Sequence, residues 1–327
     1  MQNIIVVPTY NRPEKTTRVL SIYTKILSAK YKVVVLDGSE DRLETGNLPP
    51  SKTGCSIDYR HMPGRALNDR LLEYLSSVDE KKFIAMGNDE DIFLPGFLDE
   101  AFALTESTQN YVCVWGSYVT WQKKLFGLPR VSSWRNVILK EDISHSDPVQ
   151  RCFHLRKVLE FGCAPVFWSV RPASIFIRSI EAFDGLKYGS AAEFVDQTLL
   201  PILGPVRLID LPMLWRDETG QVWDERRDVY NVPIGVEADV GKVFKDHNIP
   251  NGAALAKILS IAYSPEDQAV PLWWRNFKSL YSAKNMSGDV FWGLAGWIEK
   301  IGVLVSEVFF AIGWRRWARK QDLKALL

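Results

Sequence analysis

Short apolar runs that end in polar residues recur along the first ninety residues of the chain. Apolar runs of this length are typical of buried strands in an α/β sheet. They predict strands at residues 3–7, 32–36, 57–61 and 83–86. Apolar positions at helical spacing predict a helix that begins near Pro13, where a missing N–H is tolerated, and a second helix over residues 66–77. Strands and helices therefore alternate, and polar residues collect where the strands end.

The pattern continues less regularly after residue 90. A helix is expected over residues 93–104, a strand over 111–115 and a further helix over 190–203. The chain changes character near residue 220, and helical patterns dominate from there to the end. We therefore expect a sheet-containing unit over residues 1–218 and a helical C-terminal region over residues 219–327.

Three consecutive acids follow the apolar run at residues 83–86. In an extended backbone, residues two apart point to the same side, so Asp89 and Asp91 are expected to converge while Glu90 faces away. Two convergent carboxylates suit a hard cation such as Mg²⁺ or Mn²⁺, which completes its shell with water and substrate phosphates. A solvated acidic turn is the alternative interpretation.

Four segments together resemble a known family. They are Val7-Pro8-Thr9-Tyr10-Asn11-Arg12, Leu36-Asp37-Gly38-Ser39, the region Arg65-Ala66-Leu67-Asn68, and Gly87-Asn88-Asp89-Glu90-Asp91. In this order and at this spacing they resemble the GT-A-fold glycosyltransferases, in particular the family 2-like branch of bacterial surface-polysaccharide synthesis. The resemblance implies a mixed, mainly parallel sheet flanked by helices, with a nucleotide-sugar half over residues 1–105 and an acceptor half over residues 106–218.

The resemblance also implies an activity: transfer of a sugar from a nucleotide-diphosphate donor to a saccharide or lipid-linked saccharide acceptor, with Mn²⁺ or Mg²⁺. The acids would hold the metal through Asp89 and Asp91, and Asp37 would contact the base or ribose. The implied nucleotide-sugar site comprises Pro8, Thr9, Tyr10, Asn11, Arg12, Asp37, Gly38, Arg65, Asn68, Asn88 and Asp89. The Q-x-x-R-W signature of processive family members is absent from the sequence, which argues against a polymer-extruding synthase.

Several of these residues also have structural explanations. Asp37-Gly38-Ser39 is a good turn on composition alone, because Gly tolerates positive φ and Asp and Ser bond to nearby backbone. Thr9 and Asn11 are suitable caps for the helix near Pro13, a role compatible with anion binding at a helix N-terminus. Arg65 is either a surface charge or a partner of the diphosphate.

An inverting transferase needs a carboxylate that takes the proton from the acceptor hydroxyl. Glu193 and Asp196 are three residues apart on the predicted helix 190–203 and therefore share one face, opposite apolar residues expected in the core. Either is a candidate base, by similarity to the acidic pair that relatives place on a helix after the metal strand. The alternative is an exposed acidic face near a helix N-terminus.

Composition restricts the function classes. The 327-residue chain carries 40 basic and 39 acidic residues, so its net charge gives no case for a nucleic-acid partner. Its four cysteines form no C-x-x-C pair, which indicates reduced, cytosolic thiols. The beginning of the chain lacks the basic region and long apolar run of a signal peptide, so we expect a cytoplasmic location.

The last forty residues combine apolar and basic character. Charged residues interrupt the apolar run at three- to four-residue intervals, which predicts an amphipathic helix rather than a membrane span, followed by tryptophans and arginines. Residues 291–320 therefore suit peripheral contact with the inner leaflet of the cytoplasmic membrane. Packing on the chain's own domain or on a second subunit in a homo-oligomer is the alternative.

Three other functions fit the sequence less well than sugar transfer. A sugar-nucleotide pyrophosphorylase uses a similar sheet but needs a glycine-rich, arginine-bearing first loop, which residues 8–11 do not form. A dinucleotide dehydrogenase needs G-x-G-x-x-G after the first strand, and the chain has none there. A non-catalytic sugar-binding protein is disfavoured by the intact acids Asp89 and Asp91 without being excluded by them.

Overall fold

The computed structural model describes residues 2–44, 51–105, 111–124, 128–134, 141–158, 167–182, 189–217, 236–250 and 252. Its helices are α1 (Pro13–Ile26), α2 (Leu67–Ser76), α3 (Pro95–Thr105), α4 (Pro148–Val158), α5 (Ala173–Ala182), α6 (Gly189–Leu203) and α8 (Val236–Asp246). Its strands are β1 (Asn3–Thr9), β2 (Tyr31–Asp37), β3 (Ser56–His61), β4 (Phe83–Met86), β5 (Asp91–Phe93), β6 (Cys113–Lys124), β7 (Leu128–Trp134), β8 (Glu141–Ile143), β9 (Val170–Pro172) and β10 (Val206–Asp217).

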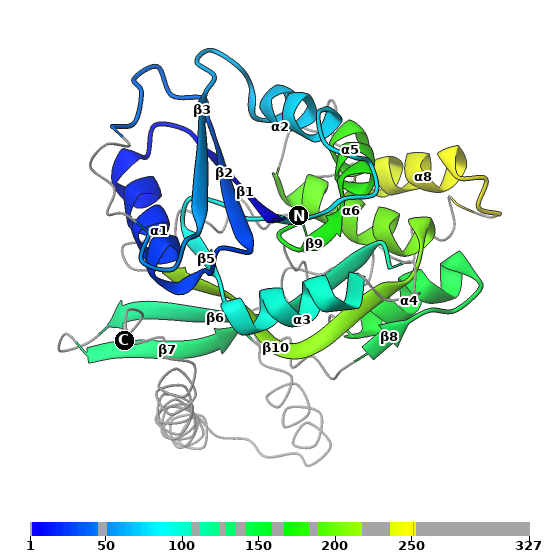
Figure 1. Ribbon diagram of the computed structural model, residues 1–327. Coiled ribbons are helices and arrows are strands. Elements are labelled where there is room, and N and C mark those ends of the chain that lie inside the picture. Colours follow the sequence, from blue (N-terminus) through cyan, green and yellow to red (C-terminus); the bar gives the residue numbers. More distant parts are fainter. Residues whose placement is uncertain are drawn as a thin grey trace, which may run out of the picture.

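One mixed sheet organises these elements (Figure 1). Its order is β3-β2-β1-β4-β9-β6-β10-β5, with β7 added to β6 and β8 added to β10. The first four strands are parallel, whereas β9 and β5 run antiparallel to their neighbours. The chain builds outward from β1 to β3 and then returns to place β4 on the other side of β1. The strand order thus reverses between β1 and β4, and open α/β sheets bind their ligands at the carboxyl ends of strands at such a switch point.

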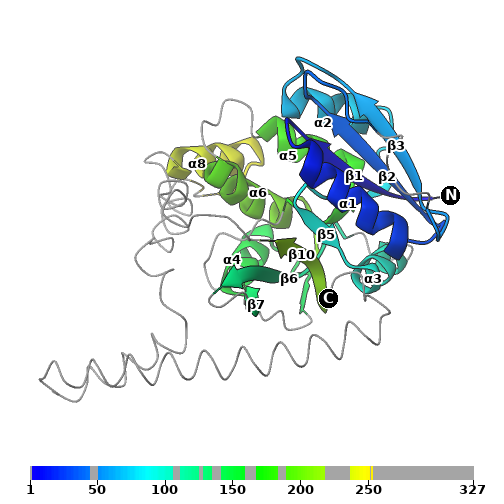
Figure 2. The same cartoon turned by 90° about the vertical axis from the view of Figure 1, so that its left-hand side faces the viewer.

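Helices cover both faces of the parallel half of the sheet, with α1 and α2 on opposite sides (Figure 2). Alternate residues of one strand face opposite cores, because the side-chain period of a strand is two. Ile5 and Val7 of β1 belong to the core that contains buried residues of α1 and α3. Val6 belongs to the core that contains buried residues of α2 and α5. Both faces of β1 are therefore buried, which explains its uninterrupted apolar sequence.

The helices α4, α6 and α8 form a third core. Cys152 of α4 packs with buried residues of α6 and α8, among them Phe194 and Val240. The apolar face predicted for the helix at 190–203 is confirmed, because Phe194, Val195, Leu199 and Leu200 are all buried.

The predicted α/β fold class, a mixed sheet flanked by helices, is confirmed. All four strands predicted in the first ninety residues are present, and the helices predicted at 66–77, 93–104 and 190–203 correspond to α2, α3 and α6. Strand β5 was not predicted. It pairs with β10, and its Phe93 N–H donates to the Tyr23 hydroxyl of α1 at 3.0 Å.

Long-range pairing with β10 defines β5, since a strand of three residues is too short to show a pattern of apolar and polar positions.

The proposed division at residue 218 stays a prediction, and residues 291–320 lie outside the described part of the chain. Among the described residues, no helix has the length and apolar character needed to cross a membrane.

Candidate active site

The carboxyl ends of β1, β2 and β4 bring together the segments that the sequence singled out. Thr9 is the last residue of β1 and lies in register with Asp37, the last residue of β2. Backbone hydrogen bonds to β1 continue one residue past the ends of β2 and β4. Gly38 N–H, after β2, donates to Thr9 O at 3.1 Å, and Gly87 N–H, after β4, donates to Val6 O at 2.8 Å. The polar residues that follow the three strands therefore lie at one edge, on both sides of the switch point.

The Asp37 carboxylate holds the turn after β2. Its Oδ1 accepts hydrogen bonds from the backbone N–H of Ser39 at 2.9 Å and from the Ser39 hydroxyl at 2.5 Å. Its Oδ2 accepts a hydrogen bond from the Tyr59 hydroxyl at 2.6 Å. Burial, reinforced by this bond to Asp37, raises the pKa of Tyr59 to about 12, so Tyr59 remains a donor at neutral pH. The turn role of Asp37 is thus present, and a contact with the base or ribose stays a prediction.

Arg70 of α2 lies against this turn, and it is not among the residues predicted from the sequence. Its side chain is 3% exposed, and its Nη1 donates to Thr9 O at 2.7 Å and to Leu36 O. Burial lowers the pKa of the guanidinium, with the charge of Asp37 opposing that effect. In the sequence, Arg70 resembles a surface charge of an amphipathic helix; only the folded sheet shows that it joins the ends of β1 and β2.

The absence of a side chain at Gly38 makes room for Arg70. A Cβ at this position would lie 2.6 Å from Arg70 Cζ, so Gly38→Ala must displace the guanidinium from the Thr9 and Leu36 carbonyls. Because the buried guanidinium loses two acceptors, even though Thr9 O keeps the bond from the Gly38 N–H, we expect Gly38→Ala to lower the free energy of unfolding by about 1–3 kcal/mol.

Urea denaturation measures this change. Gly96→Ala is the matched control, because a Cβ there meets nothing within 4 Å, and it should leave stability unchanged or slightly higher. Equal stability of Gly38→Ala and the wild-type protein would show that Arg70 does not depend on this space.

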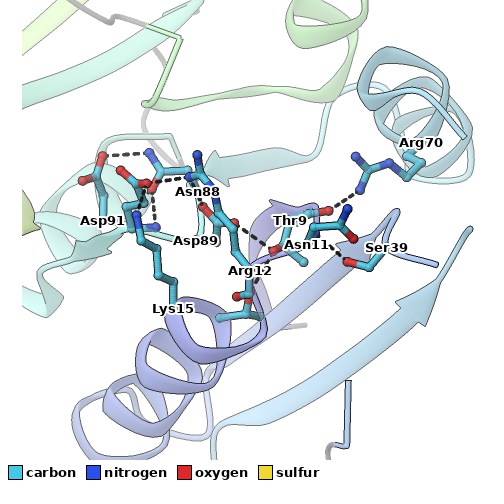
Figure 3. Close-up of polar contacts among 11 residues, drawn as sticks. Thr9, Asn11, Arg12, Lys15, Ser39, Arg70, Asn88, Asp89 and Asp91 are labelled. Carbon is cyan, nitrogen blue, oxygen red and sulfur yellow. Dashed lines mark hydrogen bonds and ion pairs between the residues drawn. The ribbon is translucent and has the colours of Figure 1, made fainter. Parts of the chain in front are cut away.

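Buried hydroxyls connect β1 to the acidic segment (Figure 3). Thr9 Oγ1 donates to Asp89 Oδ2 at 2.8 Å and lies 2.7 Å from Thr16 Oγ1 of α1. Thr16 Oγ1 in turn donates to Arg12 O at 2.9 Å. Neither Thr9 nor Asn11 caps α1, whose N-cap residue is Arg12 and makes no side-chain capping bond. The capping alternative is therefore wrong, because the Thr9 hydroxyl bonds to the acidic segment instead.

The acidic segment is a turn rather than a continuation of the strand. β4 ends at Met86, and Asn88 Oδ1 accepts hydrogen bonds from the N–H groups of Glu90 and Asp91 at 2.8 and 2.7 Å. Asn88 Nδ2 also donates to Asp91 Oδ2 at 2.8 Å. An Asn side chain that bonds to backbone two residues on imposes a turn. The expected alternation of sides therefore does not apply, and Glu90 shares a partner with Asp89 instead of facing away from it.

Two cations at the start of α1 bind the acids: Arg12, its N-cap residue, and Lys15 in its first turn. Arg12 Nη1 lies 3.3 Å from Asp89 Oδ1 and 2.5 Å from Glu90 Oε1, and Lys15 Nζ lies 2.5 Å from the same Glu90 oxygen (Figure 3). The side chains of Arg12 and Lys15 are about half exposed, whereas those of Asp89 and Glu90 are mostly covered. Lys15 was not predicted, although its position three residues after Arg12 on a helix was a usable signal.

Burial raises the pKa of Asp89 above its ordinary value, although the hydrogen bond from Thr9 and the charge of Arg12 oppose the shift. Desolvation disfavours a charged carboxylate, so any additional cation at this position favours its ionised form. Asp91 is fully buried, at 0% exposure, and is the first residue of β5.

Carboxylate and amide oxygens fit a hard divalent cation better than a soft one. Within the described ranges, however, no three His, Cys, Asp or Glu residues gather as a candidate metal cluster. A Mg²⁺ or Mn²⁺ ion held by one or two protein carboxylates and completed by substrate phosphates is compatible with this arrangement.

The other predicted nucleotide-site residues occupy the same edge or flank it. Asn11 adopts a left-handed backbone, with φ 52°, and its N–H donates to Ser39 Oγ at 2.8 Å, which joins the first loop to the second. Tyr10 is exposed and Pro8 is buried. Arg65 is exposed and forms an ion pair with Glu73 of α2, and Asn68 is half-buried on the same helix.

The two candidate bases on α6 have different environments. Asp196 is fully buried, and its two oxygens accept hydrogen bonds from Nη1 and Nη2 of Arg171 at 2.8 and 2.6 Å. Burial alone would lower the pKa of Arg171, but attraction to Asp196 outweighs it and the pKa is raised. Ser169 and Ser179 also bond to this guanidinium. Glu193 is half-buried. Glu193 and Asp196 therefore do not share an exposed face of α6, because the Asp196 carboxylate is buried in an ion pair with Arg171.

No family model matches the chain, and no curated protein matches it significantly. Among solved structures, residues 1–349 of Staphylococcus aureus TarS in complex with UDP-GlcNAc are 13% identical, with 73% of this chain and 66% of that one covered and a TM-score of 0.46. The chain thus spans just under two thirds of that structure.

A Pyrobaculum calidifontis mannosyltransferase in complex with GDP-Man and Mn²⁺ is 14% identical, with 98% and 84% covered and a TM-score of 0.44. Glucosyl-3-phosphoglycerate synthase from Mycobacterium tuberculosis, in complex with Mn²⁺, UDP-glucose and phosphoglyceric acid, is 13% identical, with 76% and 81% covered and a TM-score of 0.39.

Proposed function

We propose that the protein is a glycosyltransferase that moves a sugar from a nucleotide-diphosphate donor to a saccharide or lipid-linked saccharide acceptor, with Mn²⁺ or Mg²⁺. The observation that carries the proposal is the switch point between β1 and β4, where Thr9 and Arg12 both contact Asp89. A site for a nucleotide sugar needs cations for its phosphates and carboxylates for a metal, and cationic and carboxylate side chains lie together there.

The proposed roles follow from these positions. Arg12 and Lys15 are cationic and half exposed, so they can bind phosphate oxygens, and guanidinium does so in a bidentate manner. Asp89 and Asp91 would hold the metal, which when bound neutralises charge on the departing diphosphate. Arg70 and the Asp37 turn keep the ends of β1 and β2 together beneath the donor. Glu193 is the proposed base for the acceptor hydroxyl, since it is half-buried whereas Asp196 is 0% exposed inside the protein.

Metal-dependent binding of a nucleoside diphosphate is the first expectation. In a thermal-shift panel of nucleoside diphosphates, we expect one base to raise the melting temperature with Mn²⁺ and to have little effect in EDTA. A ligand at one hundred times its Kd stabilises the folded state by about 2.7 kcal/mol. Asp89→Asn should remove the shift, whereas Asp246→Asn, an exposed acid at the end of α8, should retain it. An unchanged shift in EDTA would contradict the metal assignment.

Cytoplasmic location and peripheral membrane contact belong to the same proposal. Both rest on the sequence, in particular on the basic and aromatic residues between 291 and 320, which lie outside the described ranges. An inner-leaflet position would place the enzyme beside lipid-linked acceptors.

A further inference from the structure

We propose that Arg12 competes with the divalent cation for Asp89, so that metal binding displaces its guanidinium and makes it available to the donor diphosphate. This inference rests on the proposed function and assigns Arg12 a second role within the same site. Arg12 would then be a positioning residue that couples the binding of metal to the binding of nucleotide.

The first support is that hydrogen-bond donors already engage both oxygens of Asp89. Oδ2 accepts from the Thr9 hydroxyl at 2.8 Å, and Oδ1 lies 3.3 Å from Arg12 Nη1. A metal ion would bind through lone pairs of the same carboxylate, and its two positive charges repel a guanidinium that shares its ligand. Binding of the metal therefore favours movement of the guanidinium away from Oδ1.

The second support is that the contacts differ in their freedom to move. Thr9, Thr16 and Asp89 are each at most 5% exposed and are linked by buried hydrogen bonds, so the carboxylate is held in place. The side chain of Arg12 is 49% exposed and is long and flexible. Displacement should therefore move the guanidinium and not the carboxylate.

The third support is charge balance around the acidic turn. Glu90 Oε1 is shared by Arg12 and Lys15, so Glu90 keeps a cationic partner after Arg12 leaves. The released guanidinium is then adjacent to a metal that carries anionic phosphates, with which it forms strong hydrogen bonds. Metal and diphosphate should consequently each strengthen the binding of the other, because a thermodynamic coupling is reciprocal.

The test is a calorimetric titration of Mn²⁺ alone into the full-length wild-type protein and the Arg12→Gln variant. Removing the competitor should lower the Kd for Mn²⁺ about two- to fivefold, the size expected for a partly exposed ion pair. With the nucleoside diphosphate selected by the thermal-shift panel also present, the gain in Mn²⁺ affinity caused by the nucleotide should be smaller in Arg12→Gln than in the wild-type protein.

Lys25→Gln is the matched control, because it removes the same charge from the last turn of the same helix. Its Kd for Mn²⁺ should equal that of the wild-type protein. If Arg12→Gln binds Mn²⁺ no more tightly than the wild-type protein, or if Lys25→Gln shows the same gain, the competition is wrong and the proposed function is unaffected. If no variant binds Mn²⁺ and none binds a nucleoside diphosphate, the competition and the proposed function both fail.

Discussion

Asp196→Asn is expected to lower the free energy of unfolding by about 3–5 kcal/mol, because it leaves the Arg171 charge buried with a much weaker partner. Both side chains of the pair are 0% exposed, so water cannot replace the lost carboxylate without opening the structure. The pair also joins β9 to α6, and the rings of Phe167 and Phe176 lie against the guanidinium. A loss of this size is a large fraction of the stability of a typical domain.

Urea denaturation of two further variants tests whether the loss of stability comes from the unpaired charge of Arg171. Glu181→Gln, an exposed acid on α5, should leave the unfolding midpoint unchanged. The double variant Arg171→Met with Asp196→Leu removes both charges together, and a buried ion pair replaced by apolar residues is often neutral or stabilising. It should therefore recover most of the stability lost in Asp196→Asn. Wild-type stability of Asp196→Asn would contradict the energetic role of the pair.

The same double variant tests whether Asp196 takes part in chemistry. A residue that only holds α6 in position can be replaced together with its partner, whereas a general base cannot. Turnover close to that of the wild-type protein in a stable double variant would exclude Asp196 as the base.

Glu193→Gln is expected to lower turnover by a factor of about one hundred to ten thousand while donor binding persists, the usual cost of removing a general base. Glutamine keeps the size and polarity of the side chain but cannot accept the proton of the acceptor hydroxyl. Release of nucleoside diphosphate in the presence of acceptor measures turnover, and calorimetry with Mn²⁺ and the nucleoside diphosphate measures binding at the donor site.

Glu181→Gln again serves as the control and should be fully active. Measuring turnover and donor binding together separates two explanations of lower turnover in Glu193→Gln. Lower turnover with unchanged donor binding indicates an effect on the chemical step, whereas a parallel loss of both indicates that α6 has shifted. Normal turnover in Glu193→Gln would show that the base lies elsewhere or that transfer proceeds with retention.

The candidate site was partly predictable. The sequence located Thr9, Asp37 and Asp89 at strand ends, because apolar runs followed by polar residues identify both a buried strand and its boundary. It did not identify how these residues contact each other. Asp89 pairs with Arg12 from 77 positions earlier, and Arg70 binds a carbonyl 61 positions away. Partners at such distances leave no periodicity in the chain.

The acidic turn shows why one local expectation was wrong. The prediction that Glu90 faces away from Asp89 assumed a continuing strand, but Asn88 bonds to the backbone ahead of it and β4 ends at Met86. Asn is a common turn residue, so the signal was present in the sequence.

By itself, the sequence determined the alternation of strands and helices in the first ninety residues and the edge at which their polar residues collect. The spacing of apolar residues is sufficient for this, because a helix with one buried face and a fully buried strand each produce a recognisable order of apolar residues along the chain. Only the tertiary structure decided the charge partners: Asp196 faces Arg171 inside the protein, and Arg12 covers Asp89. The reason is that the environment of an ionisable group depends on the burial and charge of elements that meet only after the sheet has formed.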